Sequence, residues 1–327
     1  MNNTAKIFAV AKKEYSDALK NKVFLVFLAF LLFLIGISIV VASFDFQSKV
    51  VVYQNALAKL KQSGQMVENL SEPQFYPLQL LRGAIEYLEI IGAILAIVLG
   101  YLSIAKEKGN NTLQLILTRP ISRISFYAGK FLGNALLIIS VSGIVFVGIT
   151  LVVEIVGKTI LTGPQLFRIL LAFAFTVIYL LIFFSISVLL STLLKSLPNA
   201  LIVSFVIWIF FVLIIPQIGD TMDPDNQVPG GLFNSLHIEK ANQLLILEKF
   251  SRYEKTRDNL EQTSLTKHYE RLAFALLGIK DTYNGKSLDF VFHDRAVDAW
   301  WISIASILFG SLGALAFVKK RMLWKEE

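Results

Sequence analysis

The side chains that could bind a metal or act as nucleophiles are few and widely separated in this sequence. The three histidines, His237, His268 and His293, stand apart, and none belongs to the HExxH pattern that binds zinc. His293 lies next to Asp294 and near Asp298, but two carboxylates and one imidazole in a charged loop are a weak ligand set. Cysteine is absent, so no thiolate is available. We therefore expect no metal centre.

A phosphate-binding loop and a serine nucleophile elbow are also missing. The pair Gly129-Lys130 has Ile124 where the GxxxxGK[ST] motif requires glycine, and Phe131 where it requires serine or threonine. No GxSxG motif occurs anywhere in the chain. The sequence therefore predicts that this chain is not an enzyme and holds no cofactor of its own.

Three carboxylates stand in or beside long apolar runs, where an ionisable group is costly and usually faces a partner or a water path. Glu154, in the run LVVEIVGK, could line a substrate route, pair with Arg168 or Lys158, or lie at the level of the lipid headgroups. Glu86 and Glu89 are about one helical turn apart, and they too could line a substrate route or lie at the level of the lipid headgroups. We take all three as candidate residues of a translocation path.

The composition predicts what kind of structure holds these carboxylates. The chain has 327 residues, 55% of them hydrophobic and only 17% charged, whereas soluble domains have about 25% charged residues. Its mean hydropathy is +0.63. The sequence therefore predicts an integral membrane protein. In such a chain a net charge of +7 does not indicate nucleic acid, because basic residues can be sorted to one face of a bilayer.

Six apolar runs predict six transmembrane helices and an all-α polytopic fold. The runs are 23–41, 85–104, 133–156, 169–190, 200–218, which Pro216 should close, and 299–318. Residues 1–22 have the pattern of an amphipathic helix lying on the membrane surface. Between the runs we expect a polar extracytoplasmic loop over 42–84, a cytoplasmic segment over 105–132, an extracytoplasmic helical insertion over 219–298, and a basic tail within 299–327.

The distribution of basic residues predicts the orientation. The face that carries both termini has fifteen Lys and Arg, whereas the short loops opposite carry six. By the positive-inside rule we expect both termini and the segment 105–132 to face the cytoplasm. The membrane that the chain spans would then be the inner membrane of the cell. The insertion 219–298 then lies outside, where it could gate a substrate, dock a partner, or simply pack on the span ends.

The cytoplasmic segment has more internal structure than a generic basic loop requires. Asn110 and Asn111 are suitable N-caps for a short helix with an apolar stripe, which the pair Arg119-Pro120 should end. A second short amphipathic piece follows over 121–130. Two short helices of this kind would form a rigid projection on the membrane surface.

The run EKGNNTLQLILTRPISRISFYAGKFLG resembles the cytoplasmic segment of type-2 ABC transporter permeases, and within them the nitrous-oxide-reductase-maturation group. The resemblance implies a transmembrane permease subunit of an exporter that pairs with a second permease chain in membrane lipid. Separate ABC ATPase subunits would bind ATP and Mg and would contact this segment; no nucleic acid is implied. The residues implied in ATPase coupling are Glu107, Gly109, Thr112, Leu113, Arg119, Pro120 and Arg123.

Two other classes of membrane protein are alternatives to an ABC permease. A secondary transporter should show broken spans or several intramembrane charges in matching halves, and the sequence suggests neither. A membrane anchor or receptor that does not transport, and whose outer insertion binds a partner, is harder to exclude by sequence and remains the alternative.

Overall fold

The computed structural model describes residues 3–62, 77–109, 121–157, 160–222, 232–238, 242, 245, 248–249 and 251–319. Within these residues every regular element is helical, and none is a strand. Six of the helical stretches described are long and apolar enough to cross a membrane. The prediction of an all-α polytopic membrane protein with six spans is therefore confirmed.

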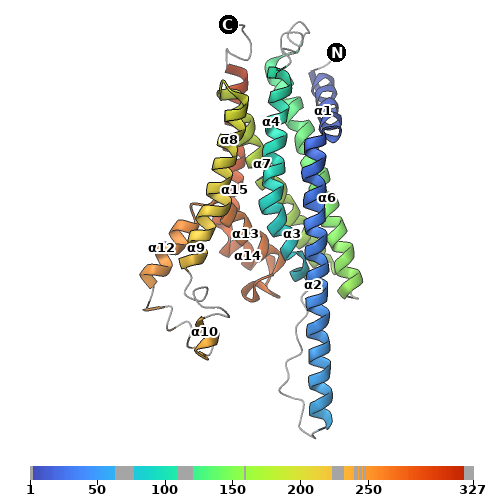
Figure 1. The fold of residues 1–327 in the computed structure, drawn as a ribbon, viewed down its shortest axis with the longest axis vertical. Coiled ribbons are helices and arrows are strands. Elements are labelled where there is room, and N and C mark those ends of the chain that lie inside the picture. The colour runs from blue at the N-terminus through green and yellow to red at the C-terminus, as the bar shows by residue number, and fades with distance from the viewer. Residues whose placement is uncertain are drawn as a thin grey trace.

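The six spans follow the order of the six apolar runs. They are α2 (Lys22–Gln62); η2 (Pro77–Leu81), α3 (Arg82–Tyr87), η3 (Leu88–Gly92) and α4 (Ala93–Gly109); α6 (Arg123–Gly157); α7 (Gly163–Leu193); α8 (Leu197–Trp208), η4 (Ile209–Ile214) and α9 (Ile215–Met222); and α15 (Ala296–Lys319). They form an upright bundle, and α1 (Asn3–Leu19) lies beside its upper end in Figure 1. We call this the α1 end of the bundle.

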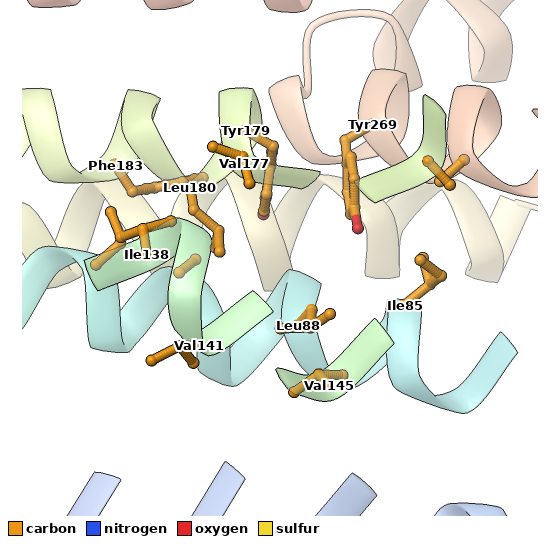
Figure 2. Close-up of a cluster of buried hydrophobic side chains, with 14 of the residues drawn as sticks. Ile85, Leu88, Ile138, Val141, Val145, Val177, Tyr179, Leu180, Phe183 and Tyr269 are labelled. Carbon is orange, nitrogen blue, oxygen red and sulfur yellow. The ribbon is translucent and has the colours of Figure 1, made fainter. Parts of the chain in front are cut away.

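Helix α7 lies in the middle of the bundle and contacts α4, α6, α8, α13 (Leu265–Leu277) and α15. Its buried side chains face several directions, as expected for a helix that is apolar all round. Figure 2 shows Tyr179 and Phe183 of α7 in one cluster with Ile138 of α6 and Tyr269 of α13. The Tyr179 and Tyr269 rings stack with centroids 4.3 Å apart. The core therefore includes a helix from the insertion.

Helix α2 is much longer than the first apolar run predicts. The sequence suggests a span over 23–41 followed by a polar loop over 42–84, whereas the helix continues to Gln62. Residues 37–62 contain neither glycine nor proline, so nothing in this stretch breaks the backbone hydrogen bonds. Its 41 residues extend roughly 60 Å, about twice the thickness of a hydrocarbon core. The lower part of α2 projects below the rest of the bundle in Figure 1.

Pro216 does not end the fifth span, which corrects the sequence prediction. The helix continues to Met222, and the residues Ile209–Ile214 just before Pro216 form a π-helical segment. Here the Ile215 N–H donates to the carbonyl of Phe210, five residues back. Proline has no N–H, and its ring crowds the carbonyl four residues back. A wider turn relieves that crowding, so the helix can pass through the proline.

The residues between the fifth and sixth spans are also helical where the structure describes them. They form α10 (Leu232–Ser235), α12 (Ser251–Glu261), α13, η6 (Asp281–Tyr283) and α14 (Leu288–Asp294). Helix α13 begins after Ser264, whose hydroxyl accepts from the Lys267 N–H, and ends at Gly278, whose φ is 64°. Residues 272–277 are buried, so α13 is part of the core rather than a solvated cap. We call this the α13 end of the bundle.

Candidate functional site

A buried lysine ties three helices together at the α1 end. Lys130, near the start of α6, is 3% exposed. Its Nζ atom donates to Glu14 Oε1 of α1 at 2.7 Å, to Glu107 Oε1 of α4 at 3.2 Å, and to the Ser103 carbonyl oxygen of α4 at 2.8 Å. Glu14 and Glu107 are also buried, at 5% and 4% exposed. We call the three charged residues the Glu14–Lys130–Glu107 cluster.

The cluster uses the full donor capacity of the lysine. An ammonium group has three N–H donors, and Lys130 directs them at three acceptors. The Lys130 Nζ also lies 5.0 Å from the centroid of the Phe126 ring, where a cation–π interaction adds to its stabilisation. On its outer side Glu107 is 3.8 Å from Lys13 Nζ. Buried charges are tolerated when they are paired and hydrogen-bonded in this way.

Two glycines let α1 approach α6 closely enough for Glu14 to reach Lys130. A Cβ atom placed on Gly129 would lie 2.6 Å from the Val10 Cβ, and one on Gly133 would lie 2.5 Å from the Ala11 carbonyl oxygen. The pair is spaced as Gly-x-x-x-Gly, the arrangement that brings helix backbones together in membranes. Glycine at these two positions is therefore required by the packing of α1 and not by backbone conformation.

Both ends of the segment 105–132 are held at this junction. On α4, the Lys108 Nζ donates to the Leu194 carbonyl oxygen at 2.6 Å, which joins α4 to the end of α7. Lys106 lies 3.9 Å from Asp17 of α1. On α6, the Arg123 Nη1 donates to the Val318 carbonyl oxygen of α15 at 3.2 Å. Movement of this segment would therefore act on three neighbouring helices, α1, α7 and α15.

A cavity of about 890 Å³ lies at the α13 end, between the second and fifth spans and α13. Both π-helical segments, η3 and η4, contribute to its wall, and such segments are frequent at functional sites. Its lining residues are Arg82, Glu86, Glu89, Ile90, Val212, Leu213, Ile214, Pro216, Gln217, Ile218, Asp220, Lys267 and Glu270. The wall is thus apolar along η4 and carries its charged side chains on α3, η3, α9 and α13.

The cations of this cavity are paired with carboxylates. The Arg82 Nε donates to Glu86 Oε1 at 2.8 Å. The Lys267 Nζ lies 3.0 Å from Glu270 and 3.6 Å from Asp220. Burial alone would lower the pKa of Lys267, but these two carboxylates outweigh it and raise the pKa above its ordinary value. Lys267 is therefore a permanent cation at neutral pH.

A sequence model of the family described as "ABC-2 family transporter protein" matches residues 8–321, which is nearly the whole chain. The chain belongs to this family. A search of curated proteins finds no match. The protein is therefore a multi-pass membrane permease component of an ABC transporter and not its catalytic subunit. The matched residues include the Glu14–Lys130–Glu107 cluster, the segment 105–132 and every residue that lines the cavity.

The predicted coupling residues of the permease fall into three groups. Glu107 is buried in the cluster, so in this conformation it can act only by positioning the segment. Gly109 is the last residue of α4, and Arg123 is the first residue of α6. The others, Thr112, Leu113, Arg119 and Pro120, lie outside the described residues.

The three carboxylates predicted for a translocation path do not lie together. Glu86 and Glu89 line the same cavity. Glu154 is near the end of α6, where its Oε1 accepts from the Leu161 N–H at 3.4 Å, and it is not among the cavity residues. Pairing with Arg168, one of the alternatives left open for Glu154, is not found in the described part of the chain, because Arg168 donates instead to the carbonyl oxygens of Leu276 and Lys286.

Sequence reasoning missed Glu14 and Lys130 as functional residues. The sequence pattern places Glu14 in the amphipathic helix over 1–22 and Lys130 in the cytoplasmic segment, and it gives neither side chain a role of its own. A signal did exist for Lys130, because it stands within a helix that is otherwise apolar on both sides, between Gly129 and Phe131. Such a lysine must find a partner or reach the interface. The sequence offered no means of choosing Glu14, which is 116 positions away.

Proposed function

We propose that the permease couples ATP hydrolysis by a separate ATPase to the export of a substrate. It would pair with a second permease chain and bind two ABC ATPase subunits, which hold ATP and Mg. The segment 105–132 would contact the ATPase, and the cavity at the α13 end would belong to the translocation path. Assignment to the nitrous-oxide-reductase-maturation group stays a prediction from the sequence of that segment.

The observation that carries this proposal is the anchoring of both ends of the coupling segment. Glu107 lies near the start of the segment and Lys130 near its end, and their side chains meet in a buried ion pair. An ATPase that pushes on the segment would therefore move α4 and α6 together with α1. A loop that served only membrane orientation would need no such buried network, since exposed lysines suffice for that purpose.

The same proposal places the α1 end in the cytoplasm. Fifteen Lys and Arg on this side against six on short loops opposite support that orientation. The cavity would then lie toward the outer face of the inner membrane, which is where an exporter releases its substrate. A cavity on the outer side of the membrane is therefore in the place that export requires.

Two substitutions in the coupling segment test the proposal. The variants Leu113→Asp and Arg119→Glu should insert in the membrane normally but lose copurification of an ABC ATPase subunit. Lys59→Glu, a charge reversal on the exposed far part of α2, is the matched control and should retain the ATPase. Unchanged copurification in both segment variants would overturn the proposed coupling role.

A further inference from the structure

One carboxylate of the cavity has no cation or donor of its own. Glu89 is 7% exposed and lines the cavity. Within the part of the chain that the structure describes, its carboxylate makes no hydrogen bond or ion pair, although its backbone carbonyl accepts from the Tyr179 hydroxyl at 3.0 Å. A buried carboxylate without donors is unfavourable, and a native structure rarely keeps one without a reason.

The charges around Glu89 point to a positively charged ligand. Four carboxylates line the cavity, namely those of Glu86, Glu89, Asp220 and Glu270, against the two cations Arg82 and Lys267. Arg82 is engaged by Glu86, and Lys267 by Glu270 and Asp220. Even with Glu89 left out, three carboxylates face two cations, so negative charge is in excess, and the electrostatic field of the cavity favours a cation and opposes an anion.

The rest of the wall fits a hydrocarbon group. Ile90 of η3 and Val212, Leu213 and Ile214 of η4 line the cavity together with Pro216. Leu213 and Ile214 are each more than one-third exposed, so their side chains are accessible for contact. A volume of about 890 Å³ lies within the range of ligand-binding sites, roughly 300 to 1,000 Å³.

We propose that the cavity binds an amphipathic amine, with its ammonium group on Glu89 and its apolar part against η3 and η4. The ammonium would supply the hydrogen-bond donors and the positive charge that Glu89 lacks. This inference rests on the proposed function, because it names the substrate class of the same translocation path. It also assigns different roles to the two predicted carboxylates, since Glu86 neutralises Arg82 while Glu89 receives the ligand.

Binding of monodansylcadaverine, a fluorescent primary amine, tests the proposal on the purified full-length permease in lipid nanodiscs. The wild type should bind it saturably, and Glu89→Gln should weaken binding by about tenfold or more, as expected for loss of a charged hydrogen bond. Asp289→Asn is the matched control, because Asp289 is an exposed carboxylate of α14 outside the cavity, and it should bind as the wild type does. The N-acetylated probe, which has no charge, should not bind saturably.

A second variant keeps the test decisive if Glu89→Gln fails to fold. Leu213→Trp enlarges an exposed side chain of the cavity wall and should reduce binding by steric exclusion. Equal affinity in the wild type and Glu89→Gln, or equal affinity for the acetylated probe, would overturn the amine site.

The outcome is separable from that of the coupling experiment. The binding assay contains no ATPase, so a failure here with normal ATPase copurification removes the substrate class and leaves the permease function standing. Amine binding without ATPase copurification would remove the coupling role and leave the site.

Discussion

Replacing Lys130 by methionine should strongly destabilise the permease. The substitution keeps a side chain of similar length but removes the cation that Glu14 and Glu107 share. Both carboxylates are buried and would lose this counter-charge, although Lys13 still lies 3.8 Å from Glu107. Breaking a buried ion pair by removing one partner costs about 3–5 kcal/mol. We therefore expect the free energy of unfolding to fall by about that amount.

Removing all three charges gives a sharper test than the single substitution. The triple variant Glu14→Met, Lys130→Met, Glu107→Met leaves no uncompensated buried charge, and replacing a whole buried ion cluster by well-packed hydrophobic residues of similar volume is often neutral or stabilising. Its stability should therefore recover most of the loss seen in Lys130→Met. Reversible unfolding in mixed detergent micelles, followed by fluorescence of the four tryptophans, measures both values. The reasoning fails if Lys130→Met costs less than about 1 kcal/mol, the range of an exposed ion pair, or if the triple variant is the less stable of the two.

The same variants separate a stabilising role from a positioning role. If the cluster holds the coupling segment in place, Lys130→Met should reduce ATPase copurification at temperatures where the bundle remains folded, and the triple variant should restore part of it. Full copurification by a folded Lys130→Met variant would show that the cluster stabilises the bundle without positioning the segment.

Three further predictions concern the packing of α1 and the charges of two lysines. Gly133→Leu places side-chain atoms against the Ala11 carbonyl oxygen, so α1 should separate from α6. The chain has no cysteine, so a cysteine introduced at the buried position Ala11 should then react with maleimide. Gly148→Leu is the control, because a Cβ at Gly148 has nothing within 4 Å, and the Ala11→Cys thiol should stay protected in it. Lys267→Met should be less stable than the wild type at neutral pH, because the raised pKa of Lys267 means that its charge stabilises the fold, and the difference should close only as pH rises above 10.5. Lys280→Met should be more stable at neutral pH, because burial lowers the pKa of Lys280 despite the nearby Glu270, and this advantage should disappear as pH rises toward 10.5. Denaturation of both lysine variants between pH 7 and 11 checks the opposite signs.

The spans were predictable because a bilayer imposes one simple condition on sequence. A segment that crosses it must be apolar over about 20 residues and must satisfy its backbone hydrogen bonds internally. All six runs meet that condition and are helical in the structure. The ends of helices are set by weaker effects, so α2 passes its predicted end by continuing to Gln62, and the fifth span passes Pro216 through a π turn.

The candidate site was predictable only where a single residue was out of place in its local context. Glu86 and Glu89 were found because carboxylates beside an apolar run require an explanation. Their neighbours Lys267 and Glu270 come from α13, which the sequence suggests is a separate outer helix. Nothing in the local pattern shows that α13 packs into the core beside α7, because that contact depends on how distant helices fit together.

The second span connects the two parts of the site. Glu107 lies near one end of this helical stretch and Glu89 lies near the other, 18 residues away, which is about 27 Å along a helix. Between them α4 runs without interruption from Ala93 to Gly109. Under the proposed function, displacement of the segment 105–132 would be carried along this unbroken helix to η3 at the cavity wall. The π-helical segment η3, which contains Glu89, interrupts the regular α-helical hydrogen bonding of the second span. A displacement carried along α4 would therefore change the cavity wall at η3.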